Sequence, residues 1–173
     1  LGQKLKTAFA VIAAEELDVE FSRITIRTAD TAVSPIEGYT AGSSSMEDSG
    51  TAIRQAAAEA RRVLLELASE KLDEPVENLS VTDGEIGGGK TNQHVSYWDL
   101  MGDKQFDREV TDGATPKNPD QYRLIGNPIS AKGIDGLVTG AMAFVHDMEL
   151  PGMVHARVVR PPRYHAGLKE LDE

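Results

Sequence analysis

SMEDSGTAIRQAAAEARRVLLELASEKL, residues 45–72, is the stretch that decides the fold. It contains no proline, and Gly50 is its one glycine. Apolar residues recur along it at steps of three and four: Ile53, Ala57, Ala60, Leu64 and Leu67. This spacing predicts a helix of about 40 Å with one apolar stripe. Its alanine-rich first half favours close packing against a stretch of backbone or another helix.

Upstream of this helix, the sequence predicts a second helix and a strand. Residues 4–17 place apolar side chains on one helical face, which predicts a helix with Glu15 and Glu16 on its solvated surface. Residues 21–26 alternate between apolar and polar and predict a half-buried strand. Residues 28–44 contain proline and glycine and indicate a loop.

Downstream, Pro75 must end the long helix. Two short alternating runs flank Asp83-Gly84, a strong hairpin signal, and residues 94–101 fit either a strand or a short helix. Residues 103–121 indicate a linker, and residues 122–173 a second, mostly β unit. The expected class is α+β, with two helices packed on a small sheet and a β unit after it.

Composition narrows the kinds of partner. A formal net charge of −10 and a pI near 4.9 argue against nucleic acid. The absence of cysteine excludes disulfides and thiolate ligands within this chain, and no apolar run is long enough to cross a bilayer. The sequence leaves the cellular compartment of the protein open. Both ends read like cuts in a longer protein, and apolar faces exposed by such cuts would promote self-association.

GEIGGGKT, residues 84–91, fits the phosphate-loop pattern letter for letter. Such a loop needs a buried strand before it and a helix after Lys90-Thr91. Here Gly84 serves better as a hairpin corner, and the residues after Thr91 lack an apolar stripe. A nucleotide-binding P-loop is therefore kept as an alternative only.

The start of the long helix is a better anion site. Gly42 and three serines, residues 43–45, precede it, so hydroxyls and free N–H groups would gather at the positive end of a helix. Ser44 with Glu47, or Ser45 with Asp48, could instead form a capping box. Gly2-Gln3 precedes the first helix in the same way.

Together these segments resemble the large subunit of molybdenum hydroxylases, the xanthine dehydrogenase and aldehyde oxidoreductase family. The match is best to the isoquinoline 1-oxidoreductase β-subunit or nicotinate dehydrogenase B-subunit type. It rests on Gly2-Gln3, on residues 30–50, and on LPGMVHARVVRPP at residues 150–162, which resembles the start of an α/β-hammerhead domain.

The resemblance implies a cofactor, partners and a reaction. Residues 1–102 would form part of a molybdopterin-binding domain, 103–121 a linker, and 122–173 part of the hammerhead domain. The cofactor would be molybdopterin cytosine dinucleotide carrying molybdenum. An iron–sulfur subunit or domain, the rest of the large subunit, and a heteroaromatic or aldehyde substrate would be the partners. The cofactor-binding residues carried over are Gly2, Gln3, Gly42, Ser43 and Ser45.

Two departures from the family pattern limit what this chain can do. Lys4 replaces the second glycine of Gly-Gln-Gly, which restricts the backbone but adds a cation. The family's catalytic glutamate has no counterpart here, so no catalytic residue is assigned and the isolated chain is expected to be inactive. The four histidines are dispersed, so no metal ligand is assigned. A non-catalytic interaction domain, in which the serines only cap the helix, is the second alternative.

Overall fold

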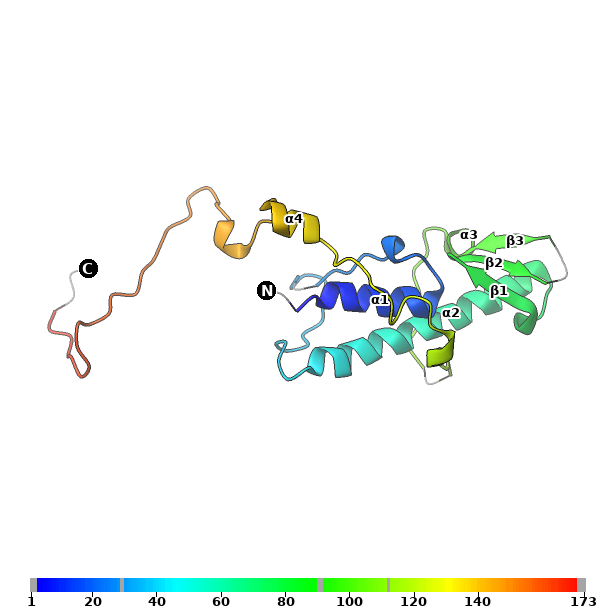
Figure 1. Ribbon diagram of the computed structural model, residues 1–173, viewed down its shortest axis with the longest axis horizontal. Coiled ribbons are helices and arrows are strands. Elements are labelled where there is room, and N and C mark those ends of the chain that lie inside the picture. The colour runs from blue at the N-terminus through cyan, green and yellow to red at the C-terminus, as the bar shows by residue number, and fades with distance from the viewer. Residues whose placement is uncertain (1–2, 29, 90–91, 112, 171–173) are drawn as a thin grey trace. The chain divides into compact units, whose positions relative to one another are not determined.

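The computed structural model describes residues 3–28, 30–89, 92–111 and 113–170 (Figure 1). The chain divides into two compact units, residues 1–134 and 135–173, and each is described by itself. The first unit contains both long helices and the sheet, which confirms the α+β class.

The two helices of the first unit are α1 (Leu5–Leu17) and α2 (Thr51–Leu72). The long helix predicted from Ser45 begins with a π-helical turn, η2 (Ser45–Gly50), and continues as α2. It ends at Asp73, whose φ of 53° is left-handed, two residues before Pro75. A residue in this conformation commonly terminates a helix, and proline cannot continue one.

α1 runs parallel to η2 and α2, and both begin at the same end of the unit (Figure 1). Ile12 lies 3.5 Å from the position that a Cβ on Gly50 would take. One turn further along, the Arg54 side chain meets Glu16. Gly50 therefore gives α1 close access to the start of the long helix.

A three-stranded antiparallel sheet packs on the second half of α2. Its strands are β1 (Leu79–Thr82), β2 (Glu85–Gly88) and β3 (His94–Ser96), in that order. Asp83 and Gly84 form the predicted hairpin turn, both with positive φ. β3 leads directly into α3 (Tyr97–Met101), so residues 94–101 form both a strand and a helix.

The core of the first unit lies between α1, α2 and the sheet. Ile86 on β2 and Ala68 on α2 are fully buried at its centre. The remaining members come from these elements and the residues next to them: Ala14, Val19, Leu64, Leu65, Leu72, Val81, Val95 and Tyr97. α2 is thus packed on the sheet as the sequence predicted, while α1 packs mainly on α2.

The strand predicted at residues 21–26 is wrong. Phe21–Arg23 form a 3₁₀ turn, η1, and the backbone after it pairs with no strand among the described residues. The Arg23 guanidinium donates two hydrogen bonds to Asp83 in the hairpin turn. This side-chain bond, not a backbone ladder, joins the segment to the sheet, so alternation alone misled the prediction.

The strands predicted after Tyr122 are also absent from the part of the chain that the structure describes. The second unit holds most of the short helix α4 (Ile134–Thr139) and a 3₁₀ turn, η5 (Val145–Asp147). Residues 151–170 are exposed and have no strand partner. Because a strand is stabilised by hydrogen bonds to a neighbour, an apolar pattern alone does not form one. The hammerhead assignment stays a prediction.

Candidate functional site

The start of α1 adopts a backbone conformation that usually requires glycine. Lys4 has a φ of 58°, and its carbonyl accepts hydrogen bonds from the N–H groups of Thr7 and Ala8. The lysine thus adopts a left-handed geometry that glycine takes more readily. Gln3 precedes it with an exposed side chain, and Gly2 lies outside the described residues.

The start of the long helix has the same handedness. Gly42 and Ser43 have φ values of 57° and 65°, and the Ser43 carbonyl accepts from the N–H groups of Met46 and Glu47. Among the described residues, no heavy atom lies within 4 Å of the position that a Cβ on Gly42 would take. The backbone at Gly42 is therefore open to close approach by a ligand.

The serine hydroxyls are bonded locally and do not cap the helix. Ser44 Oγ donates to the Ala41 carbonyl at 2.7 Å, and Ser45 Oγ donates to Thr40 Oγ1 at 3.2 Å. Neither predicted capping box forms, because the helix opens with a π-helical turn that has no side-chain cap. The hydroxyls therefore point back toward the preceding loop.

A hollow of about 280 Å³ lies beside this turn. Its lining includes three residues with hydroxyl groups, Ser44, Ser45 and Ser49, and two with carboxylates, Glu37 and Asp48. The hydroxyls are suitable donors for an anion. The two carboxylates would repel one, so the balance between these groups decides how strongly an anion binds.

The parallel helices bring the two predicted half-sites level with each other. Ile12 of α1 packs on Gly50, the last residue of η2, and the two helices run in the same direction (Figure 1). The start of α1 at Leu5 and the start of η2 at Ser45 therefore lie at the same end of the first unit. Gln3 does not line the serine hollow itself.

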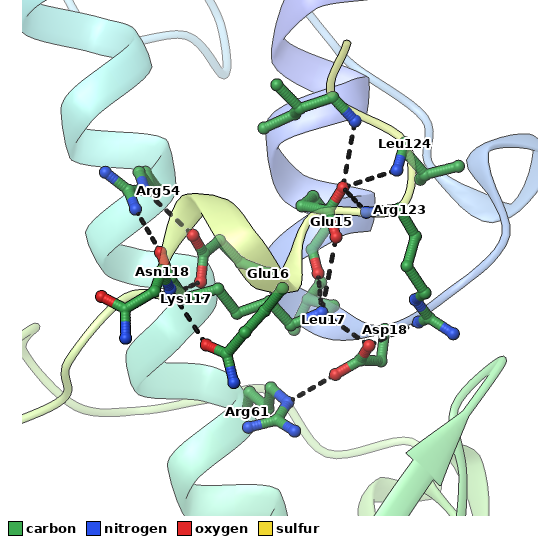
Figure 2. A network of polar contacts seen from close by, with 12 residues as sticks. Glu15, Glu16, Leu17, Asp18, Arg54, Arg61, Lys117, Asn118, Arg123 and Leu124 are labelled. Atoms are coloured by element: carbon green, nitrogen blue, oxygen red, sulfur yellow. Dashed lines mark hydrogen bonds and ion pairs between the residues drawn. The ribbon is translucent and has the colours of Figure 1, made fainter. Parts of the chain in front are cut away.

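A buried carboxylate cluster at the other end of α1 was missed by the sequence reasoning. Glu15 and Glu16, predicted to be solvated, are each only 1% exposed. Glu15 Oε2 accepts three backbone N–H groups, from Arg123, Leu124 and Ile125, at 2.7–3.0 Å (Figure 2). The prediction of a solvated surface is wrong because a distant segment covers this face.

Glu16 and Asp18 bind the same segment. Glu16 Oε2 accepts the Lys117 backbone N–H at 2.9 Å, and its Oε1 accepts Arg54 Nε at 2.9 Å. Asp18 Oδ1 accepts both Lys117 Nζ and the Arg123 guanidinium, while its Oδ2 accepts Arg61 Nε at 2.8 Å (Figure 2). The region predicted as a linker therefore contributes buried hydrogen bonds to the first unit.

One sequence signal could have revealed this cluster. Acidic residues at positions 15, 16 and 18 occupy the C-terminal end of a helix, where the helix dipole favours cations. Carboxylates at such a place need nearby positive groups or N–H donors to be stable. The sequence contains the necessary lysine and arginines, but only the fold brings them there.

The phosphate-loop alternative fails in the described part of the motif. Residues 85–88 form strand β2, which pairs with β1 on one side and β3 on the other. Gly84 is the hairpin corner, as its φ of 77° requires. A central strand has no free N–H row for a phosphate. Lys90 and Thr91 lie outside the described residues.

Two other kinds of site are absent from the described ranges. No group of three or more His, Asp or Glu side chains there could hold a metal ion. No helix there combines the length and the apolarity that a bilayer crossing needs.

Three known oxidoreductases resemble this chain over most or all of its length. The chain is 38% identical to the B subunit of nicotinate dehydrogenase from Pseudomonas putida over 164 residues, 94% of this chain and 14% of that protein. It is 27% identical to the beta subunit of isoquinoline 1-oxidoreductase from Brevundimonas diminuta over 94% of this chain and 26% of that protein. It is also 27% identical to a membrane-bound aldehyde dehydrogenase [pyrroloquinoline-quinone] of Gluconacetobacter polyoxogenes, over 100% of this chain and 23% of that protein.

The chain thus spans about a quarter or less of the length of these curated relatives. Residues 1–142 match the family described as the molybdopterin cofactor-binding domain. This range contains both helix starts and the buried carboxylate cluster. The resemblance to molybdenum hydroxylase subunits is confirmed, and the chain belongs to the family of molybdopterin cofactor-binding domains.

Proposed function

We propose that the starts of α1 and η2 hold the pyrophosphate of a molybdopterin cytosine dinucleotide. The observation that carries this proposal is the parallel direction of the two helices, which begin at the same end of the first unit (Figure 1). Two helix N-termini at one end place their N–H groups and positive dipole ends near a common anion.

The assigned residues have distinct roles in this site. Gly42 leaves its backbone open to the pyrophosphate. The Ser45 hydroxyl would turn from Thr40 to donate to it, and the Ser43 hydroxyl would donate beside it. Gln3 would contact the pterin side from the start of α1, together with Gly2. Lys4 supplies a cation where the family has glycine, which offsets part of the repulsion from Glu37 and Asp48.

The bound cofactor would supply the molybdenum and the redox chemistry, since the metal is held by the pterin and needs no protein ligand. The larger protein would hydroxylate a carbon next to nitrogen in a heteroaromatic ring, or an aldehyde carbon, using oxygen from water. An iron–sulfur subunit or domain would receive the electrons. This chain would bind cofactor without turning over substrate, because none of its carboxylates matches the family's catalytic glutamate.

The site can be tested on this chain by NMR titration of a ¹⁵N-labelled sample with inorganic pyrophosphate. We expect the amide signals of Gln3, Lys4 and residues 43–45 to shift together as one binding event. Ser45→Ala should weaken the binding about tenfold, because it removes a hydroxyl donor to a charged group. Ser80→Ala, an exposed change on β1, is the matched control and should leave the affinity unchanged.

Two results would reject this proposal. One is a shift confined to a single helix start, which would mean that the two tips do not share a ligand. The other is equal weakening of pyrophosphate binding by Ser45→Ala and Ser80→Ala.

A separate experiment concerns activity. The isolated chain, mixed with cofactor, should oxidise neither a heteroaromatic compound nor an aldehyde.

A further inference from the structure

The segment that crosses α1 near its C-terminal end is here called the strap, residues 114–132. It is separated from α1 by about a hundred residues of sequence, as the bonds of Lys117 to Glu15 and Glu16 show. It contains one 3₁₀ turn, η4 (Pro119–Gln121), and no strand. The strap is the last part of the first unit before residues 135–173.

We propose that the strap is a detachable latch that opens as a unit while α1, α2 and the sheet stay folded. When closed, it fixes the path of the chain that leads into residues 135–173. When open, it frees that connection. This inference does not depend on the cofactor site, which lies at the other end of α1.

The closed latch is held mostly by polar bonds to three carboxylates of one helix end. Glu15 Oε2 alone accepts three consecutive strap N–H groups, and Glu16 and Asp18 accept the backbone and the ammonium of Lys117. Such bonds to charged groups are stronger than neutral ones and depend on geometry. Three further bonds hold the strap: Arg54 and Gln55 donate to the carbonyls of Lys117 and Ala114, and the Lys132 N–H donates to Thr7 Oγ1. Opening the latch must break these polar bonds together.

The apolar core, in contrast, barely involves the strap. None of the buried residues in the core cluster lies in residues 114–132, and Leu124 is its one partly buried contact from that range. Ala114 is buried as well, but it does not belong to the cluster. A hollow of about 190 Å³, lined by Leu124, Glu15 and Thr82 among others, lies between the strap, α1 and the hairpin. Opening the strap would thus expose little apolar area, so it should cost less than unfolding the unit.

The Glu15 carboxylate is incompletely satisfied in the closed state. Its Oε1 is buried and has no hydrogen-bond partner among the described residues, although Lys117 Nζ lies 3.5 Å away. A buried acceptor without a donor is costly. Opening would let water reach this oxygen, which lowers the free energy of the open state relative to the closed one.

Hydrogen exchange on the full chain, read residue by residue by NMR, tests the latch. In the unaltered chain, the amides of Arg123, Leu124 and Ile125 should exchange faster than the slowest amides of the β1–β2–β3 ladder. Glu15→Gln should accelerate the three strap amides about tenfold or more, and the slowest ladder amides should remain slower than the strap amides. Trypsin should also cleave after Arg123 sooner in this variant.

Glu66→Gln is the matched control, because Glu66 is an exposed α2 carboxylate that pairs only with Arg62 among the described residues. It should change neither set of amides. Equal exchange of strap and ladder amides in the unaltered chain would overturn the proposal, and this measurement needs no variant. Strap amides in Glu15→Gln that exchange as slowly as the ladder amides would overturn it as well.

Discussion

Arg54 on α2 bonds Glu16 on α1 through Nε and Oε1 at 2.9 Å, and its Nη2 donates to the Lys117 carbonyl at 2.6 Å. One guanidinium thus joins the two parallel helices and the strap. The Glu16 side chain is 2% exposed and that of Arg54 37% exposed, so the acid is the buried member of the pair.

Removing the Arg54 guanidinium should destabilise the first unit more than the partial exposure of this side chain indicates. We expect Arg54→Ala to lower the free energy of unfolding by about 3 kcal/mol, because it leaves the buried Glu16 carboxylate without its charge partner. Urea denaturation followed by circular dichroism measures this. Arg23→Ala, which breaks a more exposed pair with Asp83, is the control and should cost much less. Equal losses in the two variants would contradict a buried role for Glu16.

The Tyr97 hydroxyl links the sheet side of the unit to α1. It donates to the Leu17 carbonyl at 3.0 Å, and burial raises the pKa of this hydroxyl, so it stays a neutral donor. Tyr97→Phe should lower stability by about 1 kcal/mol. Tyr164→Phe changes a fully exposed ring and should have no effect on the urea midpoint. If Tyr97→Phe left the stability unchanged, the Leu17 carbonyl would have to accept from another donor.

Acid should destabilise the first unit. Burial alone would raise the pKa of Glu15, but three backbone N–H groups and the Lys117 ammonium outweigh it, so the pKa lies below its ordinary value of 4.5. Hydrogen bonds from Arg23 and from Ser96 lower the pKa values of Asp83 and Asp99 in the same direction. The contributions of these three carboxylates to stability are fully present at pH values above their unfolded-state pKa. They are lost as the pH falls through the folded-state pKa values.

The free energy of unfolding, measured by urea at several pH values between 7 and about 3, should therefore decrease steadily below an ordinary carboxyl pKa. Glu15→Gln should be less stable at pH 7 and show a shallower decrease, because it cannot take up that proton. A pH dependence that is unchanged in Glu15→Gln would mean that Glu15 does not contribute to it.

Asp48 offers a test of charge at the proposed pyrophosphate site. It lines the serine hollow and lies in the first turn of the long helix. Asp48→Asn should strengthen binding of inorganic pyrophosphate several-fold at low salt, because it removes a like charge, and salt should reduce the gain. Isothermal titration calorimetry measures this. Asp103→Asn, an exposed change near the end of α3, should leave the affinity unchanged. Weaker binding of pyrophosphate by Asp48→Asn would contradict the expected repulsion between the Asp48 carboxylate and the anion.

The sequence alone determined the elements that depend on neighbouring residues. Side-chain spacing predicts the helix from Thr51 to Leu72. The backbone preferences of proline and glycine predict its end before Pro75 and the hairpin at Asp83-Gly84. The family was also evident from the sequence, because its motifs are short, local and ordered along the chain.

Tertiary structure alone decided the roles of Glu15, Glu16 and residues 114–132. Helical spacing gives a face to each side chain, but it does not reveal that a segment a hundred residues away covers that face with N–H groups and a lysine. Tertiary structure also decided the conformation of residues 21–26, which an Arg23–Asp83 bond joins to the hairpin in place of a strand pairing. The physical reason is the same in both cases: charge-assisted bonds between distant residues leave no periodic signal in the sequence.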